Sequence, residues 1–221
     1  MEQLSYREFI ANTVKNRPFE SAIRTEDIAD QLVKGFALPY DQARTLTNIK
    51  LKRMADKGEI ERLQKGIYCH VHQTVLEKAT PDIDEVMMKT LTVQSGAKIG
   101  YESGEFLFNR LGLTTLVPRC IEITTNRYRT KLPERCHIKV RRPAAVIADH
   151  NWRYLQFIDV VNELPNAHID AEKPEQLLAQ YVKKQQLDGL TLIFTARQHY
   201  TKKVLLQLID LLELINHLIV Q

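Results

Sequence analysis

The first 71 residues carry three helical patterns followed by two strand patterns, and this order restricts the fold more than any other feature of the chain. The first pattern begins with a capping box, S-x-x-E, formed by Ser5 and Glu8, which satisfies backbone amides at a helix start. Apolar residues follow it at helical spacing. A helix is therefore expected over about residues 5–15.

Two further helices are expected before residue 59. One begins at Thr25, with acidic residues in its first turn, and Gly35 is suited to its C-terminal cap. The other runs from about Asp41 to Lys57 and ends at Gly58. Residues that share one side of this third helix form its predicted buried face, namely Ala43, Thr47, Leu51 and Met54.

A hairpin pattern follows the third helix. Apolar residues alternate with Tyr68 and His70 between Ile67 and Val71, which is the period of a strand, and a loop with glycine, Gln64-Lys65-Gly66, precedes them. Three helices and a hairpin predict a winged helix-turn-helix over residues 1–73, with the third helix as the recognition helix.

The polar side of the third helix offers amide, hydroxyl and cationic groups, which suit base edges and phosphates. Lys65 is expected at the hairpin tip, where a cation meets phosphate. The candidate DNA-binding residues are Gln42, Thr45, Asn48, Lys52, Arg53 and Lys65. A solvated surface role is the alternative for each. A domain used only for protein contacts is a second alternative, favoured by the net charge of +2 over residues 1–72 and by Glu59 and Glu61.

The remaining residues, 74–221, are expected to form a mixed second domain, which makes the protein α+β. Residues 96–142 predict a small basic sheet, with strands at 121–125 and 137–141 and a short helix from Gly104 that stops at Gly112. This stretch carries a net charge of +6. Its possible second basic surface consists of Arg127, Arg129, Lys131, Arg141 and Arg142. The alternative is a solvated sheet edge, where cations discourage pairing with another strand.

Residues 150–221 are expected to be helical. Helices are predicted from Trp152 to before Pro165, from Pro174 onward, and around 190–197. The last helix, 201–220, has an apolar arc of about 220°, far wider than the stripe of a surface helix. It is therefore either central to its own domain or partly covered by a partner.

No motif in the chain assembles catalytic or metal chemistry. There is no GxGxxG, no G-K-[ST], no G-x-S-x-G, no H-E-x-x-H and no C-x-x-C. An enzyme such as a nuclease would be expected to carry a clustered carboxylate motif, and this sequence has none. No catalytic residue, metal or cofactor is therefore expected. The absence of a long apolar window and of a secretion signal, together with an odd number of cysteines, predicts a cytoplasmic protein without membrane contact.

Two stretches resemble a known family. They are the hairpin from Gly58 through Lys65-Gly66-Ile67-Tyr68, and Gly100-Tyr101 followed by Leu111-Gly112-Leu113-Thr114-Thr115, Pro118 and Ile123-Thr124-Thr125-Asn126. Both resemble the AbiEi family of antitoxins from type IV toxin–antitoxin and abortive-infection systems. The Leu-Gly-Leu-Thr-Thr…Pro stretch is the most specific part, and the resemblance is firmer over residues 1–142 than beyond.

The resemblance implies a role in phage defence. Family members bind inverted repeats in their own promoter as repressors, and they oppose a nucleotidyltransferase-like toxin encoded next door, without needing a stable complex with it. For this chain the expectation is a DNA-binding autorepressor that is also an antitoxin. The alternative is a protein-interaction module that binds a toxin or a second copy of itself and does not bind DNA.

Overall fold

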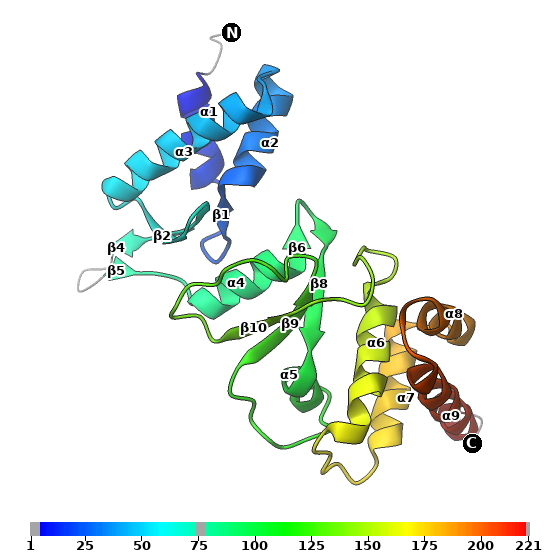
Figure 1. Ribbon diagram of the computed structural model, residues 1–221. Coiled ribbons are helices and arrows are strands. Elements are labelled where there is room, and N and C mark those ends of the chain that lie inside the picture. The colour runs from blue at the N-terminus through cyan, green and yellow to red at the C-terminus, as the bar shows by residue number, and fades with distance from the viewer. Residues whose placement is uncertain (1–4, 74–77, 220–221) are drawn as a thin grey trace. The chain divides into compact units, whose positions relative to one another are not determined.

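The structure is a computed structural model that describes residues 5–73 and 78–219. Contacts divide the chain into two compact units, coloured continuously from N- to C-terminus in Figure 1. Unit 1 is Met1–Thr90 with Lys131–Cys136, and unit 2 is Leu91–Thr130 with His137–Gln221. Unit 1 thus extends beyond residue 73, where the sequence places the domain boundary. Helices occur with small sheets throughout, which confirms the α+β class.

Unit 1 has helices packed beside a small antiparallel sheet of order β1-β3-β2. β4 and β5 form a separate antiparallel pair. The elements are α1 (Tyr6–Lys15), β1 (Ile23–Arg24), α2 (Thr25–Phe36), α3 (Tyr40–Asp56), β2 (Ile60–Gln64), β3 (Ile67–His70), β4 (His72–Gln73), β5 (Lys78–Ala79) and most of α4 (Ile83–Thr92). The core between helices and sheet includes Ile10, Ile28, Leu32, Leu51, Met54 and Tyr68.

The helix starts and stops of unit 1 follow largely from local chemistry. The capping box is confirmed, because Ser5 accepts from the backbone of Glu8 while the Glu8 carboxylate accepts from Ser5. α2 begins at Thr25 as predicted, but the prediction of Gly35 as its cap is wrong. Gly35 lies inside α2, and Ala37 takes the left-handed conformation, with φ of 52°. The helix continues to Phe36, which is partly buried and packs against the core.

The hairpin β2–β3 closes through Lys65 and Gly66, and Gly66 has a φ of +80°, which favours glycine. The predicted loop also included Gln64, which instead pairs with Ile67 after an irregularity in the register. β3 is the central strand of its sheet, and Ile67, Tyr68 and Cys69 on it are all buried, so the predicted alternation does not appear as an alternation with solvent.

Unit 2 combines a mixed sheet with a group of helices. Its elements are β6 (Val93–Gln94), β7 (Ala97–Lys98), β8 (Gly100–Ser103), α5 (Gly104–Arg110), β9 (Ile121–Thr125), β10 (Ile138–Arg141), α6 (Trp152–Glu163), η1 (Leu164–Asn166), α7 (Pro174–Gln185), α8 (Gly189–His199) and α9 (Lys202–Ile219). The main sheet has the order β10-β9-β8, with β9 and β10 parallel and β8 antiparallel to β9. Both predicted strands and the short helix are confirmed.

The helical half of unit 2 is also confirmed. α9 packs against α6, α7 and α8, and Leu208 on α9 is fully buried in the shared core. Leu206 and Leu214 on the same helix stay exposed. The first of the two expectations, a helix central to its own domain, is therefore met, while part of the apolar arc remains uncovered within unit 2. The predicted end of this helix, residue 220, lies outside the described residues. Within residues 5–73 and 78–219, no helix has both the length and the apolarity to cross a bilayer.

Candidate functional site

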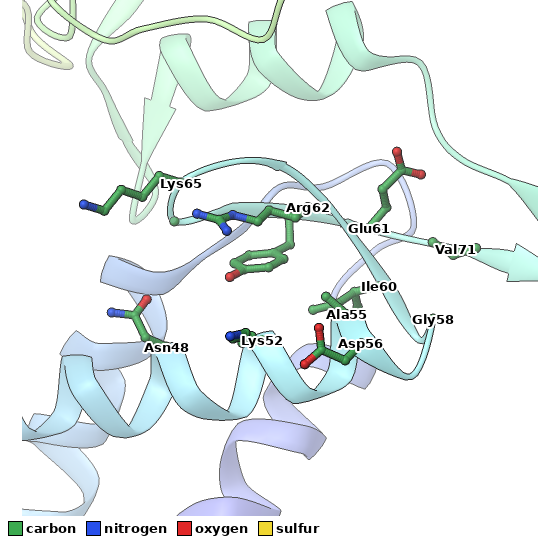
Figure 2. A pocket seen from close by; sticks show the side chains of 12 residues that line it. Asn48, Lys52, Ala55, Asp56, Gly58, Ile60, Glu61, Arg62, Lys65 and Val71 are labelled. Carbon is green, nitrogen blue, oxygen red and sulfur yellow. The ribbon is translucent and has the colours of Figure 1, made fainter.

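A groove of about 580 Å³ lies between α3 and the β2–β3 hairpin of unit 1 (Figure 2). Asn48 and Lys52 line it from α3, while Arg62 and Lys65 line it from the hairpin. The buried face of α3 determines which side chains reach this groove. Ala43, Thr47, Leu51 and Met54 are all buried, as predicted, and the Thr47 hydroxyl donates to the carbonyl of Ala43 over 2.8 Å.

The charges in the groove are separated. Figure 2 shows Asn48, Arg62 and Lys65 toward one end, and the carboxylates of Asp56 and Glu61 toward the other. None of the cations Lys52, Arg62 and Lys65 has a carboxylate within ion-pair distance in the described part of the chain. One end of the groove therefore offers an amide and unneutralised cations to a ligand. An amide both donates and accepts hydrogen bonds, whereas ammonium and guanidinium groups suit phosphates.

The predicted residues of unit 1 do not all meet. Asn48, Lys52 and Lys65 line one groove together, but Arg53 lines a different one of about 550 Å³ between α1 and α3, beside Ile49 and Lys50. Arg53 is separated because successive helical residues are about 100° apart around the axis.

The remaining predicted positions lie toward the start of α3. Gln42 and Thr45 are exposed, and the Thr45 hydroxyl donates within the helix to the carbonyl of Asp41 over 2.8 Å. Neither is among the residues lining the two grooves.

Arg62 was not among the predicted site residues. It lies opposite Tyr68 in the hairpin register, and Tyr68 belongs to the core shared with the helices. The signal was the strand period: counting by two from the apolar Ile60 places Arg62 on the side that faces α3.

Cys69 is buried in the neighbouring strand. Burial raises the pKa of its thiol to about 11, so the thiol stays protonated near neutral pH.

The possible second basic surface is divided by the fold. Lys131 belongs to unit 1, whereas the other four arginines belong to unit 2. Arg141, at the end of the edge strand β10, pairs with Glu163 and lies 3.6 Å from Glu122. It is therefore neutralised within the unit. Arg129 and Arg142 both lie over the ring of Tyr128.

A buried polar network crosses unit 2 at the sheet. Tyr101 on β8 and Tyr200 before α9 donate to the two carboxylate oxygens of Asp159, over 2.7 and 2.6 Å. Burial raises the pKa of Asp159, while the two hydroxyls and the charge of Arg141 oppose that rise. Burial and the nearby Asp159 raise the pKa of both tyrosines. The network ties the sheet to α6 and to the α8–α9 corner.

The described side chains include no group of three His, Cys, Asp or Glu residues placed to hold a metal ion. No protein-family model matches the chain, and no curated protein matches it.

Proposed function

We propose that the first part of unit 1 is a winged helix-turn-helix that binds duplex DNA through α3 and the β2–β3 hairpin. The element order α1-β1-α2-α3-β2-β3 supports this, because it provides a recognition helix followed at once by a hairpin. The observation that carries the proposal is the groove lined by Asn48, Lys52, Arg62 and Lys65, whose three cations form no ion pair with a carboxylate among the described residues.

In this mechanism α3 enters the major groove and the hairpin lies along the backbone. The amide of Asn48 reads a base edge, and a good bidentate contact contributes about 1–3 kcal/mol of discrimination against the wrong base. Lys52, Arg62 and Lys65 neutralise phosphates, which adds affinity without sequence preference.

We infer from the resemblance to the AbiEi family that the bound DNA is an inverted repeat in the protein's own promoter. The protein then acts as an autorepressor in the cytoplasm. As the antitoxin of a type IV pair, it opposes a nucleotidyltransferase-like toxin from the neighbouring gene. Co-expression with that gene tests this part, and the expected result is restored growth without a stable complex.

The DNA-binding proposal is tested by titrating the full chain on its own upstream DNA and on random DNA of equal length, at about 150 mM salt. Specific binding should be roughly 10³-fold tighter or more. Asn48→Ala should weaken only the specific complex, by about tenfold. Lys65→Ala and Arg62→Gln should weaken both complexes and reduce the salt slope by about one.

Lys34→Ala provides the control, because Lys34 is exposed near the end of α2 and does not line the groove. It should leave both affinities unchanged. Equal losses on promoter and random DNA for Asn48→Ala and Lys65→Ala would falsify the assignment of base reading to Asn48. Absence of specific binding would reject the DNA-binding proposal.

A second candidate function, a protein-interaction module, is favoured by apolar residues exposed on the last two helices. Leu190 and Phe194 on α8 are 68% and 61% exposed, and Leu206 and Leu214 on α9 are 50% and 45% exposed. A toxin or a second copy bound there would bury them. Light scattering of the pure protein and co-purification with the neighbouring gene product test this. A monomer that captures no toxin and binds its promoter firmly would reject it.

A further inference from the structure

Two arginines of unit 2 lie over a single aromatic ring. The guanidinium carbons of Arg129 and Arg142 are 5.4 and 5.5 Å from the centroid of the Tyr128 ring. Both distances fall within the range of a favourable cation–π interaction, roughly 6 Å. The ring of Tyr128 therefore has two guanidinium groups within cation–π distance, although Arg129 and Arg142 are 13 positions apart in the chain.

The parallel pairing of β9 and β10 explains this meeting. Thr124 pairs with Arg141, so the carboxyl ends of the two parallel strands lie side by side. Tyr128 follows β9 in a turn, and Arg142 directly follows β10. The turn is anchored by Asn126, whose side chain exchanges two hydrogen bonds of 2.9 Å with the backbone of Ile147. The cluster of Tyr128, Arg129 and Arg142 is thus positioned by the fold.

The two arginines of the cluster carry unneutralised charge. Both are exposed, and neither forms an ion pair with a carboxylate among the described residues. The neighbouring cations behave differently. Arg141 pairs with Glu163, and Lys139 lies 3.4 Å from Glu122. Unit 2 therefore neutralises the cations on β10 itself and leaves those over Tyr128 available to an anion.

This arrangement has the chemistry of a nucleic-acid site. A guanidinium that lies over a ring keeps its N–H groups available to phosphate oxygens. Unpaired bases stack on aromatic rings and on guanidinium planes, whereas the bases of a duplex are already stacked on one another. We propose that Tyr128, Arg129 and Arg142 bind single-stranded nucleic acid, with the arginines on its phosphates and an unpaired base stacked on the cluster. This site is separate from the duplex-binding groove proposed for unit 1 and does not depend on it.

The test is fluorescence anisotropy of the full chain with labelled oligonucleotides of about 12 nucleotides, the size range of known single-strand sites. Oligo(U) RNA, oligo(dT) DNA and a random duplex of equal length are compared. One or both single strands should bind, and the variants of the cluster should weaken that binding while leaving the affinity for the duplex unchanged. Tyr128→Leu and Arg142→Gln should each lower single-strand affinity about tenfold. Tyr128→Phe should retain it, because the ring remains.

Lys139→Gln is the matched control, since it removes one exposed positive charge from β10, the strand that Arg142 follows, and should change affinity less than about twofold. Lys65→Ala in unit 1 should also leave single-strand binding unchanged, which separates this proposal from duplex binding. If Tyr128→Leu does not fold, the Arg129→Gln/Arg142→Gln variant carries the test. Equal losses for Lys139→Gln and Arg142→Gln, or a loss of duplex affinity as large as the loss of single-strand affinity in the Arg142→Gln variant, would overturn the proposal.

Discussion

Replacing Tyr101 by Phe removes one hydroxyl from the buried network of unit 2 while keeping the ring. In the folded protein this hydroxyl donates to Asp159 over 2.7 Å, and Tyr200 donates to the other carboxylate oxygen. The variant leaves one buried oxygen of Asp159 without this donor. A hydrogen bond to a charged group contributes about 1.5–3 kcal/mol. We therefore expect Tyr101→Phe to lower the free energy of unfolding of unit 2 by about that amount.

Urea unfolding followed by Trp152 fluorescence measures this change. Trp152 is the only tryptophan of the chain, and it packs against the cluster that contains Tyr101, so its signal reports on unit 2. Tyr154→Phe is the matched control, because Tyr154 lies on α6 with Trp152 and Asp159 and its hydroxyl has no hydrogen-bond partner among the described residues. It should change stability by less than about 0.5 kcal/mol. A Tyr101→Phe variant as stable as this control would refute the reasoning.

Three further outcomes follow from burial and close contacts. Burial raises the folded-state pKa of Asp159, so in the pH window between its ordinary value and the raised value the folded state holds a proton that the unfolded state has released. Urea unfolding should show wild type losing stability relative to Asp159→Asn as pH rises through this window, above which the carboxyl is ionised in both states. Gly100→Ala should lower the free energy of unfolding by about 2–4 kcal/mol or prevent folding, because its Cβ would lie 2.3 Å from the backbone carbonyl oxygen of Leu91. Gly189→Ala meets open space and should leave the free energy of unfolding unchanged or raise it; calorimetry measures both variants. Leu208→Ala should lower the free energy of unfolding, measured by urea denaturation, by about 2–5 kcal/mol, because Leu208 is fully buried. Leu206→Ala, at an exposed position of the same helix, should lower it by less than about 1 kcal/mol.

The helices were predictable because their signals act over a few residues. A capping box at Ser5, a proline at the first position of α7 and apolar residues at helical spacing each determine backbone conformation within about one turn. The strand β8 was not predicted. Its residues are buried on both faces, and a glycine that approaches the carbonyl of Leu91 begins it, so the short stretch shows no alternation.

Sequence alone could not assign partners to side chains, because partners come from distant parts of the chain. It placed Asn48 and Lys52, one helical turn apart, on the same side of the third helix, and both line the same groove. It could not separate Arg141, which is neutralised by Glu163 on α6, from Arg142, which lies over Tyr128. That distinction depends on the parallel pairing of β9 and β10.

The sequence by itself determined which stretches are helical and where α1 and α2 begin, which face of α3 is buried, and that a cation lies at the hairpin tip. Those properties follow from interactions between near neighbours. The tertiary structure decided that Arg62 joins Asn48 while Arg53 lines another groove, and which arginines of unit 2 remain unpaired. These outcomes depend on how strands pair and helices pack across long stretches of chain, which no local pattern encodes.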